Sequence, residues 1–257
     1  MARVFVTGSA DGLGKMAAKH LMEQGHQVVL HARSTKRADD VRAELDGAEA
    51  IVVGDFSSIA ETRSIADQVN KLGVFDAVIH NAGIGYRESA LTKTLDGVPL
   101  IFAVNTLAPY ILTCLITMPN RLVYLSSGMH YGAGSHPNDI LWEGRRWNGS
   151  QAYAETKFQD AQLTFAVARL FPGVKSNAVE PGWVPTKMGG AAAPDDLDEG
   201  YRTQVWLATS SDPAAMVSGK YFFHHKQKDP DPATRDVSRQ ERLLDVCGGL
   251  SGVSLTS

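Results

Sequence analysis

The 257-residue sequence has only two cysteines, Cys114 and Cys247, and no large excess of charge of either sign. Two cysteines are too few for a disulfide scaffold or a zinc site. The formal net charge of −3 gives no electrostatic reason to expect a nucleic acid or an anionic membrane as a partner. No stretch reaches the roughly 18 consecutive apolar residues of a membrane span. Because a strand-like run begins at Arg3, we expect no signal region before it and predict a cytoplasmic globular protein.

Short apolar runs alternate with longer amphipathic segments along most of the chain. The expected strands cover residues 4–6, 28–30, 51–53, 77–79, 122–125, 176–179 and 219–223, and the expected helices cover residues 13–24, 36–45, 59–72, 98–117 and 152–170. Most strand runs are almost continuously apolar, which is typical of parallel strands covered by helices on both faces. We therefore predict an α/β fold, a single domain over 1–257 with a Rossmann-type, doubly wound parallel sheet of about seven strands.

Two segments interrupt this alternation. Residues 128–150 form a long polar and aromatic insertion, and a Pro/Asp-rich loop opens a tail, 229–257, that we expect to be irregular. The insertion holds His130 and His136, which could be read as metal ligands. No acidic or cysteine cluster accompanies them, so we expect solvent-exposed loop histidines and no metal site.

A glycine-rich turn follows the first expected strand and precedes the first expected helix. Glycines let a backbone turn sharply and approach a pyrophosphate closely, and a helix N-terminus presents free N–H groups to an anion. This context favours a dinucleotide site over a turn without a ligand. The residues that would line it are Gly8, Ser9, Gly12, Leu13 and Gly14.

The spacing of these glycines differs from the usual dinucleotide fingerprint and resembles the compact branch of the short-chain dehydrogenase/reductase family. Further motifs of that family follow in its order: Asn81-Ala82-Gly83 after the fourth strand, Asn105 in the long helix, Ser126-Ser127 after the fifth strand, the Tyr153 and Lys157 pair, and Pro181-Gly182-Trp183-Val184-Pro185-Thr186 after the sixth strand. Any one motif is weak, but the ordered set is specific. The resemblance fades after about Asp229.

Tyr153 and Lys157 are four residues apart in an expected helix, so their side chains share one face. A free tyrosine, with a pKa of about 10, is a poor base at neutral pH, and an ammonium about 5 Å away would lower that pKa by roughly two units. The resemblance implies that Tyr153 is the general acid in carbonyl reduction and the general base in alcohol oxidation. It also implies that Lys157 lowers the Tyr153 pKa and binds the nicotinamide ribose.

Two more polar residues complete the set that the resemblance implies. Ser127 would hold the carbonyl oxygen, and Asn105 would position a water that links Lys157 to solvent. Taken alone, Asn105 is equally well explained as a buried side chain that satisfies helix backbone groups. Spacing does not decide between Ser126 and Ser127, and the family usually uses the second serine.

The end of the second strand bears on the choice of nicotinamide cofactor. NAD-binding relatives carry a carboxylate there for the ribose 2′-hydroxyl, whereas this chain has Arg33 and Ser34, which suit a 2′-phosphate. Asp11 argues against NADP, because NADP-preferring relatives often carry a basic residue at its position. NADP is therefore favoured over NAD. By resemblance the cofactor also contacts Asp55, Phe56, Asn81, Ala82, Gly83, Tyr153, Lys157, Pro181, Gly182, Val184 and Thr186.

Tyr153 follows Ser127 by 26 residues, a longer spacing than in many relatives, and this resembles the retinol dehydrogenase and protochlorophyllide reductase members of the family. The insertion must arch beside the site, so Trp142 and Trp147 either line a substrate pocket or anchor the loop to the domain. In the family the segment 187–204 is a mobile substrate lid. Its glycines and carboxylates predict a flexible, solvated loop here.

The sequence thus predicts an NADP-dependent oxidoreductase that interconverts a small lipophilic ketone or aldehyde and an alcohol. The alternative is a sensor or scaffold that binds NADP without turnover, although such proteins usually lose the tyrosine or the lysine. The glycine spacing disfavours a sugar-nucleotide epimerase of the extended branch. The family commonly forms a homodimer through the helices of Asn105 and Tyr153, a face that the insertion could also cover.

Overall fold

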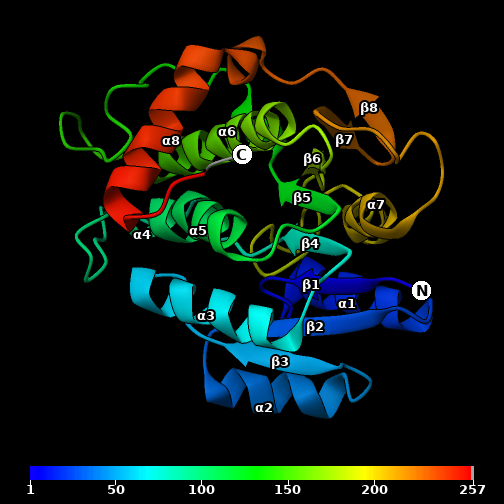
Figure 1. The fold of residues 1–257 in the computed structure, drawn as a ribbon. Coiled ribbons are helices and arrows are strands. Elements are labelled where there is room, and N and C mark those ends of the chain that lie inside the picture. The colour runs from blue at the N-terminus through cyan, green and yellow to red at the C-terminus, as the bar shows by residue number, and fades with distance from the viewer. Residues whose placement is uncertain (256–257) are drawn as a thin grey trace.

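An eight-stranded sheet runs through the computed structural model, which describes residues 1–255 (Figure 1). Its strands are β1 (Arg3–Val6), β2 (Gln27–Ala32), β3 (Ala50–Val53), β4 (Ala77–His80), β5 (Arg121–Leu125), β6 (Lys175–Glu180), β7 (Lys220–Phe223) and β8 (Lys226–Lys228). Their order is β3-β2-β1-β4-β5-β6-β7-β8, with β1 to β7 parallel and β8 antiparallel to β7. The predicted single-domain, doubly wound sheet is confirmed, and β8 is one strand beyond the seven expected.

Helices cover both faces of this sheet. One face carries α1 (Gly12–Glu23), α2 (Thr35–Glu44) and α7 (Leu197–Thr209), whose apolar side chains share one buried cluster. The other face carries α3 (Ile59–Leu72), α5 (Ala108–Leu115) and α6 (Gly149–Leu170), which contribute to a second cluster. Helix α8 (Val237–Ser251) packs on α6 and α5 as an outer layer (Figure 1).

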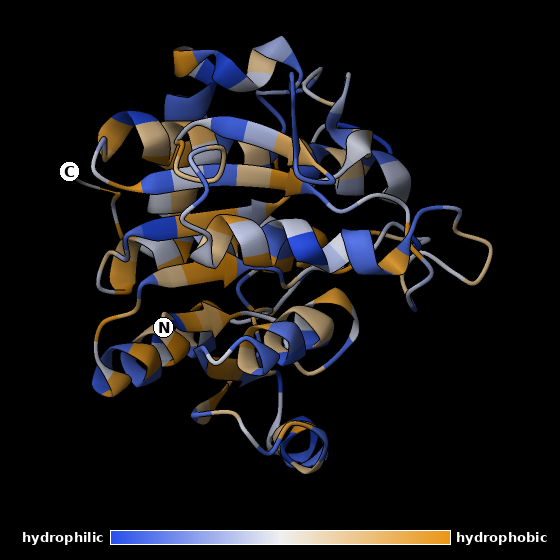
Figure 2. Cartoon of the chain, turned by 90° about the vertical axis from the view of Figure 1, so that its right-hand side faces the viewer, coloured by the Kyte–Doolittle hydropathy of each residue, from blue (hydrophilic) through white to orange (hydrophobic). Residues whose placement is uncertain are grey.

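The burial pattern explains why the strands read as continuous apolar runs. Val4, Phe5 and Val6 of β1 are all fully buried, because successive side chains point to opposite faces and both faces are covered. Apolar residues accordingly concentrate in the central strands in Figure 2, while the helices alternate between polar and apolar positions. Ser34 and Ser58 fix the starts of α2 and α3 by accepting hydrogen bonds from backbone N–H groups of the first turn.

The helix expected over 98–117 contains a local change of pitch. It divides into α4 (Leu100–Phe102), a π-helical turn η1 (Ala103–Leu107) and α5. Pro109 has no N–H, so it cannot make the regular α-helical bond back to the carbonyl of Asn105. The preceding N–H, of Ala108, bonds to the carbonyl of Ala103, five residues earlier, rather than four residues earlier as in an α-helix. The widened turn contains Asn105, and such turns are frequent at functional sites.

The expectation of an irregular tail over 229–257 is wrong for most of its length. A short turn of 3-10 helix, η3 (Pro232–Arg235), leads into the four-turn helix α8. Asp236 caps α8, and Leu243, Leu244 and Cys247 bury one face of it in the second core cluster. The flanking prolines and the Gly248-Gly249 pair obscured that helical period in the sequence. Residues 256–257 of the tail lie outside the described residues.

The segment expected to be a flexible lid, 187–204, is half helical. Residues 187–196 have turns and irregular structure, but α7 begins at Leu197 and buries Gly200, Thr203 and Gln204. A capping interaction was the missed signal, because Asp196 accepts a bond from Glu199 N–H. In the part of the chain that the structure describes, we find no helix with the length and apolarity to cross a membrane.

Candidate active site

The glycine loop between β1 and α1 has the close approaches that only glycine permits. Gly8 and Gly12 have φ values of +63° and +54°, in the left-handed region that favours glycine. A Cβ on Gly14 would lie 2.3 Å from Asn81 Nδ2 and 2.5 Å from the Gly8 carbonyl oxygen. The loop therefore presents bare backbone at the carboxyl edge of the sheet, beside the N-terminus of α1.

The segment after β4 supports that loop. Asn81 Nδ2 donates to the Thr7 carbonyl at 3.0 Å, and the N–H groups of Asn81 and Ala82 both donate to Thr7 Oγ1 at 3.0 Å. Ser9 is buried and joins β1 to β2, because its Oγ donates to the Val6 carbonyl and accepts from His31 N–H, each at 2.8 Å. These residues, predicted separately, form one connected framework.

His31 also belongs to this framework, although no sequence motif points to it. Its Nδ1 accepts from Gly8 N–H at 3.0 Å, which leaves Nε2 to donate to the Gly54 carbonyl at 2.9 Å. The ring stacks on Phe56 with centroids 4.2 Å apart. Burial lowers the pKa of His31 to about 4. A neutral imidazole thus ties the glycine loop to the ends of β2 and β3.

The residues expected to choose between NADP and NAD lie at the end of β2. Arg33 is exposed and has no ion-pair partner among residues 1–255, while Ser34 caps α2. Asp55 Oδ1 accepts from Ser57 N–H at 2.9 Å. Arg37 reaches back to the glycine loop, where its Nη2 donates to the Ala10 carbonyl at 2.9 Å and lies 3.4 Å from Asp11 Oδ2.

Asp11, the residue that argued against NADP, is paired on two sides. Besides Arg37, Lys187 of the segment after β6 forms an ion pair with its carboxylate. Partial burial alone would raise the pKa of Asp11, but the bonds from Lys187 and Gly12 N–H, with the charges of Lys187 and Arg37, lower it overall. The negative charge of Asp11 is therefore largely compensated by two cations that the sequence did not place beside it.

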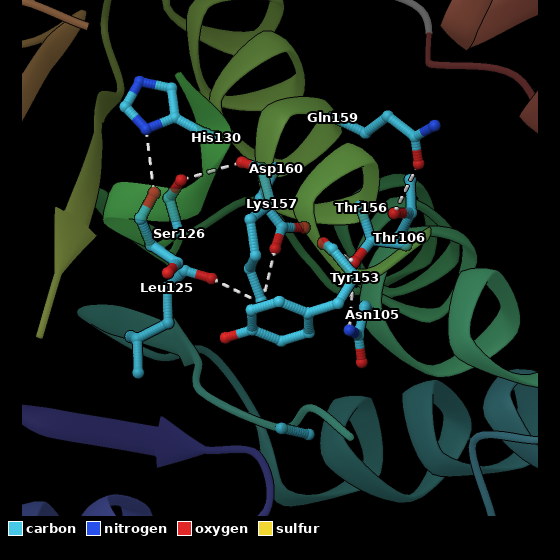
Figure 3. A network of polar contacts seen from close by, with 12 residues as sticks. Asn105, Thr106, Leu125, Ser126, His130, Tyr153, Thr156, Lys157, Gln159 and Asp160 are labelled. Atoms are coloured by element: carbon cyan, nitrogen blue, oxygen red, sulfur yellow. Dashed lines mark hydrogen bonds and ion pairs between the residues drawn. The ribbon is translucent and has the colours of Figure 1, made fainter. Parts of the chain in front are cut away.

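Tyr153 and Lys157 are brought together on α6, as predicted (Figure 3). Lys157 Nζ lies 5.8 Å from the centre of the Tyr153 ring, and both side chains are buried. Burial raises the pKa of Tyr153, whereas the Lys157 ammonium and the Ser127 side chain lower it. The net shift is upward. We expected the ammonium to bring the pKa down; its effect has that sign, but the loss of solvent outweighs it.

The two serines after β5 have different surroundings. Ser126 is buried, and its Oγ donates to the Lys157 carbonyl at 2.7 Å, which ties the end of β5 to α6 (Figure 3). Ser127 Oγ accepts a hydrogen bond from Met129 N–H at 3.2 Å. Hydrogen bonding by the Ser127 side chain lowers the pKa of Tyr153. Of the two hydroxyls that the sequence left open, Ser127 is the one beside the phenol.

Asn105 is hydrogen-bonded to the backbone of the loop after β4 and to a side chain of α6, rather than to helix backbone groups. Its Oδ1 accepts from Ile84 N–H at 2.8 Å, and its Nδ2 donates to the Ile84 carbonyl and to Thr156 Oγ1, each at 3.0 Å. It also borders Gly83, where an added Cβ would lie 3.4 Å from Asn105 Oδ1 and 3.7 Å from Lys157 Nζ. Gly83 therefore keeps space open beside both side chains.

The Pro-Gly loop after β6 closes on the glycine loop. Gly182 has a φ of +87°, and Thr186 Oγ1 accepts from Gly189 N–H at 3.2 Å. A Cβ on Gly200 of α7 would lie 3.0 Å from Val184 Cγ1, 3.1 Å from Leu13 Cδ2 and 3.3 Å from the Pro181 carbonyl oxygen. The close packing at Gly200 thus holds together Leu13, Pro181 and Val184.

The insertion is held firmly to the domain. Trp142 is buried and packs edge-on against Trp147, whose Nε1 donates to the Glu88 carbonyl at 3.0 Å. Trp142 also belongs to the small apolar cluster that contains Tyr153. Both tryptophans therefore anchor the loop. They also place it beside Tyr153.

We expected His130 to be exposed to solvent in a loop, and this is wrong: the residue is fully buried. Its Nε2 accepts from Asp231 N–H at 3.0 Å, and Nδ1 lies 2.8 Å from the Ser127 carbonyl oxygen. Burial lowers its pKa. Within residues 1–255 there is no group of three or more histidine, cysteine or acidic side chains that could hold a metal ion.

Comparisons with known proteins agree with this arrangement. A family profile described as short chain dehydrogenase matches residues 2–128. An uncharacterized oxidoreductase of Emericella nidulans is 46% identical over 99% of both chains, and a short-chain dehydrogenase of Gibberella zeae is 41% identical over 100% of both. Human retinol dehydrogenase 13 is 28% identical over 99% of this chain and 86% of its own length.

Solved structures share the fold at lower identity. An uncharacterized protein of Mycobacterium paratuberculosis has a TM-score of 0.86 and 22% identity, covering 100% of this chain and 96% of the other. A short chain dehydrogenase of Burkholderia cenocepacia, solved in complex with NADP, has a TM-score of 0.68 and 24% identity, covering 86% and 95%. At these identities the likeness concerns the fold.

Proposed function

Because the chain belongs to the short-chain dehydrogenase/reductase family, we propose that it is an NADP-dependent oxidoreductase that interconverts a small lipophilic ketone or aldehyde and the corresponding alcohol. The observation that carries the proposal is the proximity of the Tyr153 phenol to Lys157 and Ser127. These side chains gather beyond the carboxyl end of β5, at the edge where doubly wound parallel sheets bind their ligands.

The residues present fit a nicotinamide dinucleotide. When bound, such a cofactor donates or accepts the hydride at the reacting carbon. Gly8, Gly12 and Gly14 offer bare backbone at the N-terminus of α1, which suits a pyrophosphate. In this proposal Ser9 and Leu13 complete that loop, Asp55 and Phe56 hold the adenine end, and the nicotinamide end is held by Asn81, Ala82, Gly83, Tyr153, Lys157, Pro181, Gly182, Val184 and Thr186.

Tyr153 is the proton donor of the proposed reduction. Hydride addition to a carbonyl carbon leaves a negative oxygen that needs a proton, and the buried phenol, with its raised pKa, still carries one at neutral pH. Ser127 donates a hydrogen bond to the same oxygen. Lys157 stabilises the phenolate that remains, and Asn105 positions a water beside Lys157. In alcohol oxidation the same groups run in reverse, with Tyr153 accepting the proton.

NADP is preferred in this proposal because the β2 end carries cations. Arg33 is exposed and Ser34 follows it, and in this proposal both bind a 2′-phosphate by charge-assisted hydrogen bonds. Asp11 would repel that phosphate, but its charge is paired with Arg37 and Lys187. The Burkholderia cenocepacia dehydrogenase of the same fold was solved with NADP, which supports the same choice.

A lipophilic substrate is supported by the aromatic surroundings of Tyr153. The Tyr86 ring packs edge-on against the Tyr153 ring with centroids 5.7 Å apart, and Ile101 and Trp142 belong to the same apolar cluster. The segment after β6 lies close by, since an added Cβ on Gly85 would meet Met188 at 2.8 Å. An apolar carbonyl compound suits such walls better than a charged one.

A homodimer stays a prediction. Helix α8 packs on both α5 and α6, the helices expected at the dimer face, and Tyr110 of α5 donates to the Val253 carbonyl at 3.0 Å. The chain's own C-terminal segment therefore covers part of the surface that a second copy would use.

The experiment that tests the proposed function follows oxidation of NADPH and of NADH over a panel of ketones, aldehydes and quinones. We expect turnover with NADPH that is lost in Tyr153→Phe, and a smaller preference for NADPH in Arg33→Ala. Faster turnover with NADH would contradict the cofactor choice, and activity unchanged in Tyr153→Phe would contradict the mechanism. Tight NADPH binding without turnover across the panel would favour the sensor or scaffold alternative.

A further inference from the structure

Lys157 forms a buried ion pair with Asp160, which lies on the same helix (Figure 3). Lys157 Nζ lies 2.8 Å from Asp160 Oδ2 and 2.8 Å from the Leu125 carbonyl oxygen. The side chains of Lys157 and Asp160 are only 6% and 3% exposed. An ammonium has three N–H donors, so one remains after these two bonds. Gly83 leaves room near it, because an added Cβ there would lie 3.7 Å from Nζ.

Asp160 is incompletely hydrogen-bonded inside the domain. Its second oxygen, Oδ1, is buried and has no hydrogen-bond partner among the described residues. Burial raises the pKa of Asp160 to about 6, even though the Lys157 ammonium lowers it. A buried carboxylate that satisfies only one oxygen costs folding free energy. Without it, however, the buried Lys157 ammonium would lose the ion-pair partner it has among residues 1–255. The carboxylate is better explained by what it does to Lys157.

We propose that Asp160 is a positioning residue: its carboxylate holds the Lys157 ammonium in place and offsets part of that charge at Tyr153, so that the phenol keeps the proton it gives to a substrate oxygen. The proposal deepens, and rests on, the oxidoreductase function proposed above. Burial raises the pKa of Tyr153, Lys157 and Ser127 lower it, and Asp160 raises it further. Asp160 thereby favours the reducing direction, in which the phenol must start protonated.

The other groups that face this pair are neutral or do not oppose this effect. Tyr86, from the segment after β4, raises the Tyr153 pKa slightly further. Tyr124 of β5 lies near Asp160, and burial keeps its phenol protonated. His130, in the short 3-10 turn η2 (Gly128–His130), is neutral because burial lowers its pKa, and η1 contributes the uncharged Asn105 amide. Of the charged side chains that α8 brings towards α6, Glu241 pairs with Arg169, and Arg239 donates to the Gly134 carbonyl at 2.6 Å.

The test titrates the Tyr153 phenol in the full chain without cofactor or substrate. Phenolate absorbance is followed against pH for the wild type and for Asp160→Asn, each corrected by the same protein carrying Tyr153→Phe. Asp160 follows Tyr153 by seven residues on α6, about 10 Å along the helix axis. Because a unit charge about 10 Å away changes a proton affinity by roughly tenfold at an effective dielectric of ~20, we expect the Tyr153 midpoint to fall by about one pH unit in Asp160→Asn. An unchanged or higher midpoint would overturn the proposal.

The control variant is Glu155→Gln, which removes another buried carboxylate from the same helix. Glu155 pairs with Arg145 of the insertion rather than with Lys157. We expect its Tyr153 midpoint to stay near the wild-type value, and an equal fall there would mean that any buried charge on α6 has this effect. Thermal unfolding establishes that each variant is folded.

Turnover is a separate readout. If the panel of carbonyl substrates gives activity, the pH profile of alcohol oxidation should gain its activity at a lower pH in Asp160→Asn. A midpoint shift in a protein that turns over no substrate would refute the proposed function and leave the role of Asp160 standing. Activity that requires Tyr153, with no midpoint shift in Asp160→Asn, would support the proposed function and refute the role of Asp160.

Discussion

The guanidinium of Arg145 lies 3.6 Å from the centre of the Trp142 ring and also forms an ion pair with Glu155, two residues after Tyr153 on α6. A third contact joins it to Asp139, with Nε 3.1 Å from Oδ2. The Arg145 side chain therefore makes contacts within the insertion and also joins the insertion to α6, the helix that carries the candidate catalytic pair.

Arg145→Ala should destabilise the fold by roughly 3 kcal/mol. The side chain of Glu155 is 8% exposed, so removing its partner leaves a buried carboxylate uncompensated, and Trp142 loses its cation. Chemical denaturation measures the change in the free energy of unfolding. Arg202→Ala is the matched control, since Arg202 pairs with Asp198 on the surface and its loss should cost far less than the loss of Arg145. Equal losses in the two variants would show that the insertion is not anchored here.

Two glycine-to-alanine variants should separate folding from cofactor binding. In Gly14→Ala the new Cβ would meet Asn81 Nδ2 at 2.3 Å and the Gly8 carbonyl oxygen at 2.5 Å, so we expect a loss of about 1–3 kcal/mol in stability. In Gly83→Ala the nearest atom is Asn105 Oδ1 at 3.4 Å, an ordinary contact, so the fold should be retained.

The methyl group of Gly83→Ala would nevertheless occupy the space beside Lys157 Nζ. We expect weaker NADPH binding with a melting temperature close to the wild type. Calorimetric titration with NADPH and thermal unfolding make the comparison. If Gly83→Ala binds NADPH as tightly as the wild type, the cofactor does not use that space.

Stability should decline on the acid side partly because of His31. Its pKa is about 4 in the folded protein against an ordinary value of 6.5, so the unfolded chain takes up the proton first. The stability tied to neutral His31 is complete above pH 6.5 and is lost as the pH falls towards 4, a change of about 3 kcal/mol. Urea unfolding at several pH values measures this slope.

Two histidine variants make this measurement specific: His31→Gln tests the buried ring, and His136→Gln is the surface control. His31→Gln should flatten the decline between pH 6.5 and 4 without removing it, because burial also lowers the pKa of His80, to about 3. His136 is exposed in the insertion, and His136→Gln should follow the wild-type curve. A wild-type slope that persists in His31→Gln would argue against a buried neutral imidazole at that position.

The parallel sheet was predictable because its signal is local. Runs such as Val4-Phe5-Val6 and Val28-Val29-Leu30 are apolar on both faces, and serines or acids stand where the helices begin. Helix α8 was not predictable in the same way, because its apolar face is narrow and Gly248-Gly249 interrupts it. Its stability comes from packing on α6, a contact between segments far apart in sequence.

The candidate site was predictable where a motif fixes both identity and spacing, as for Tyr153 and Lys157. Its electrostatics were not. The pairing of Asp11 with Lys187 joins residues 176 positions apart in the sequence, and burial rather than the nearby ammonium decides the direction of the Tyr153 pKa shift. Asp160 could have been noticed, since it lies three residues after Lys157 on a predicted helix. Only the structure shows that both side chains turn inward.

Strand β8 has a consequence for how copies of the protein meet one another. It forms one border of the sheet, and its three residues, Lys226, Gln227 and Lys228, are all exposed. An unpaired border strand is a template on which another chain can add a strand. Two lysines in a three-residue strand oppose that addition, because a second copy would bring the same positive charges alongside. The short antiparallel strand thus protects a long parallel sheet against growth into aggregates.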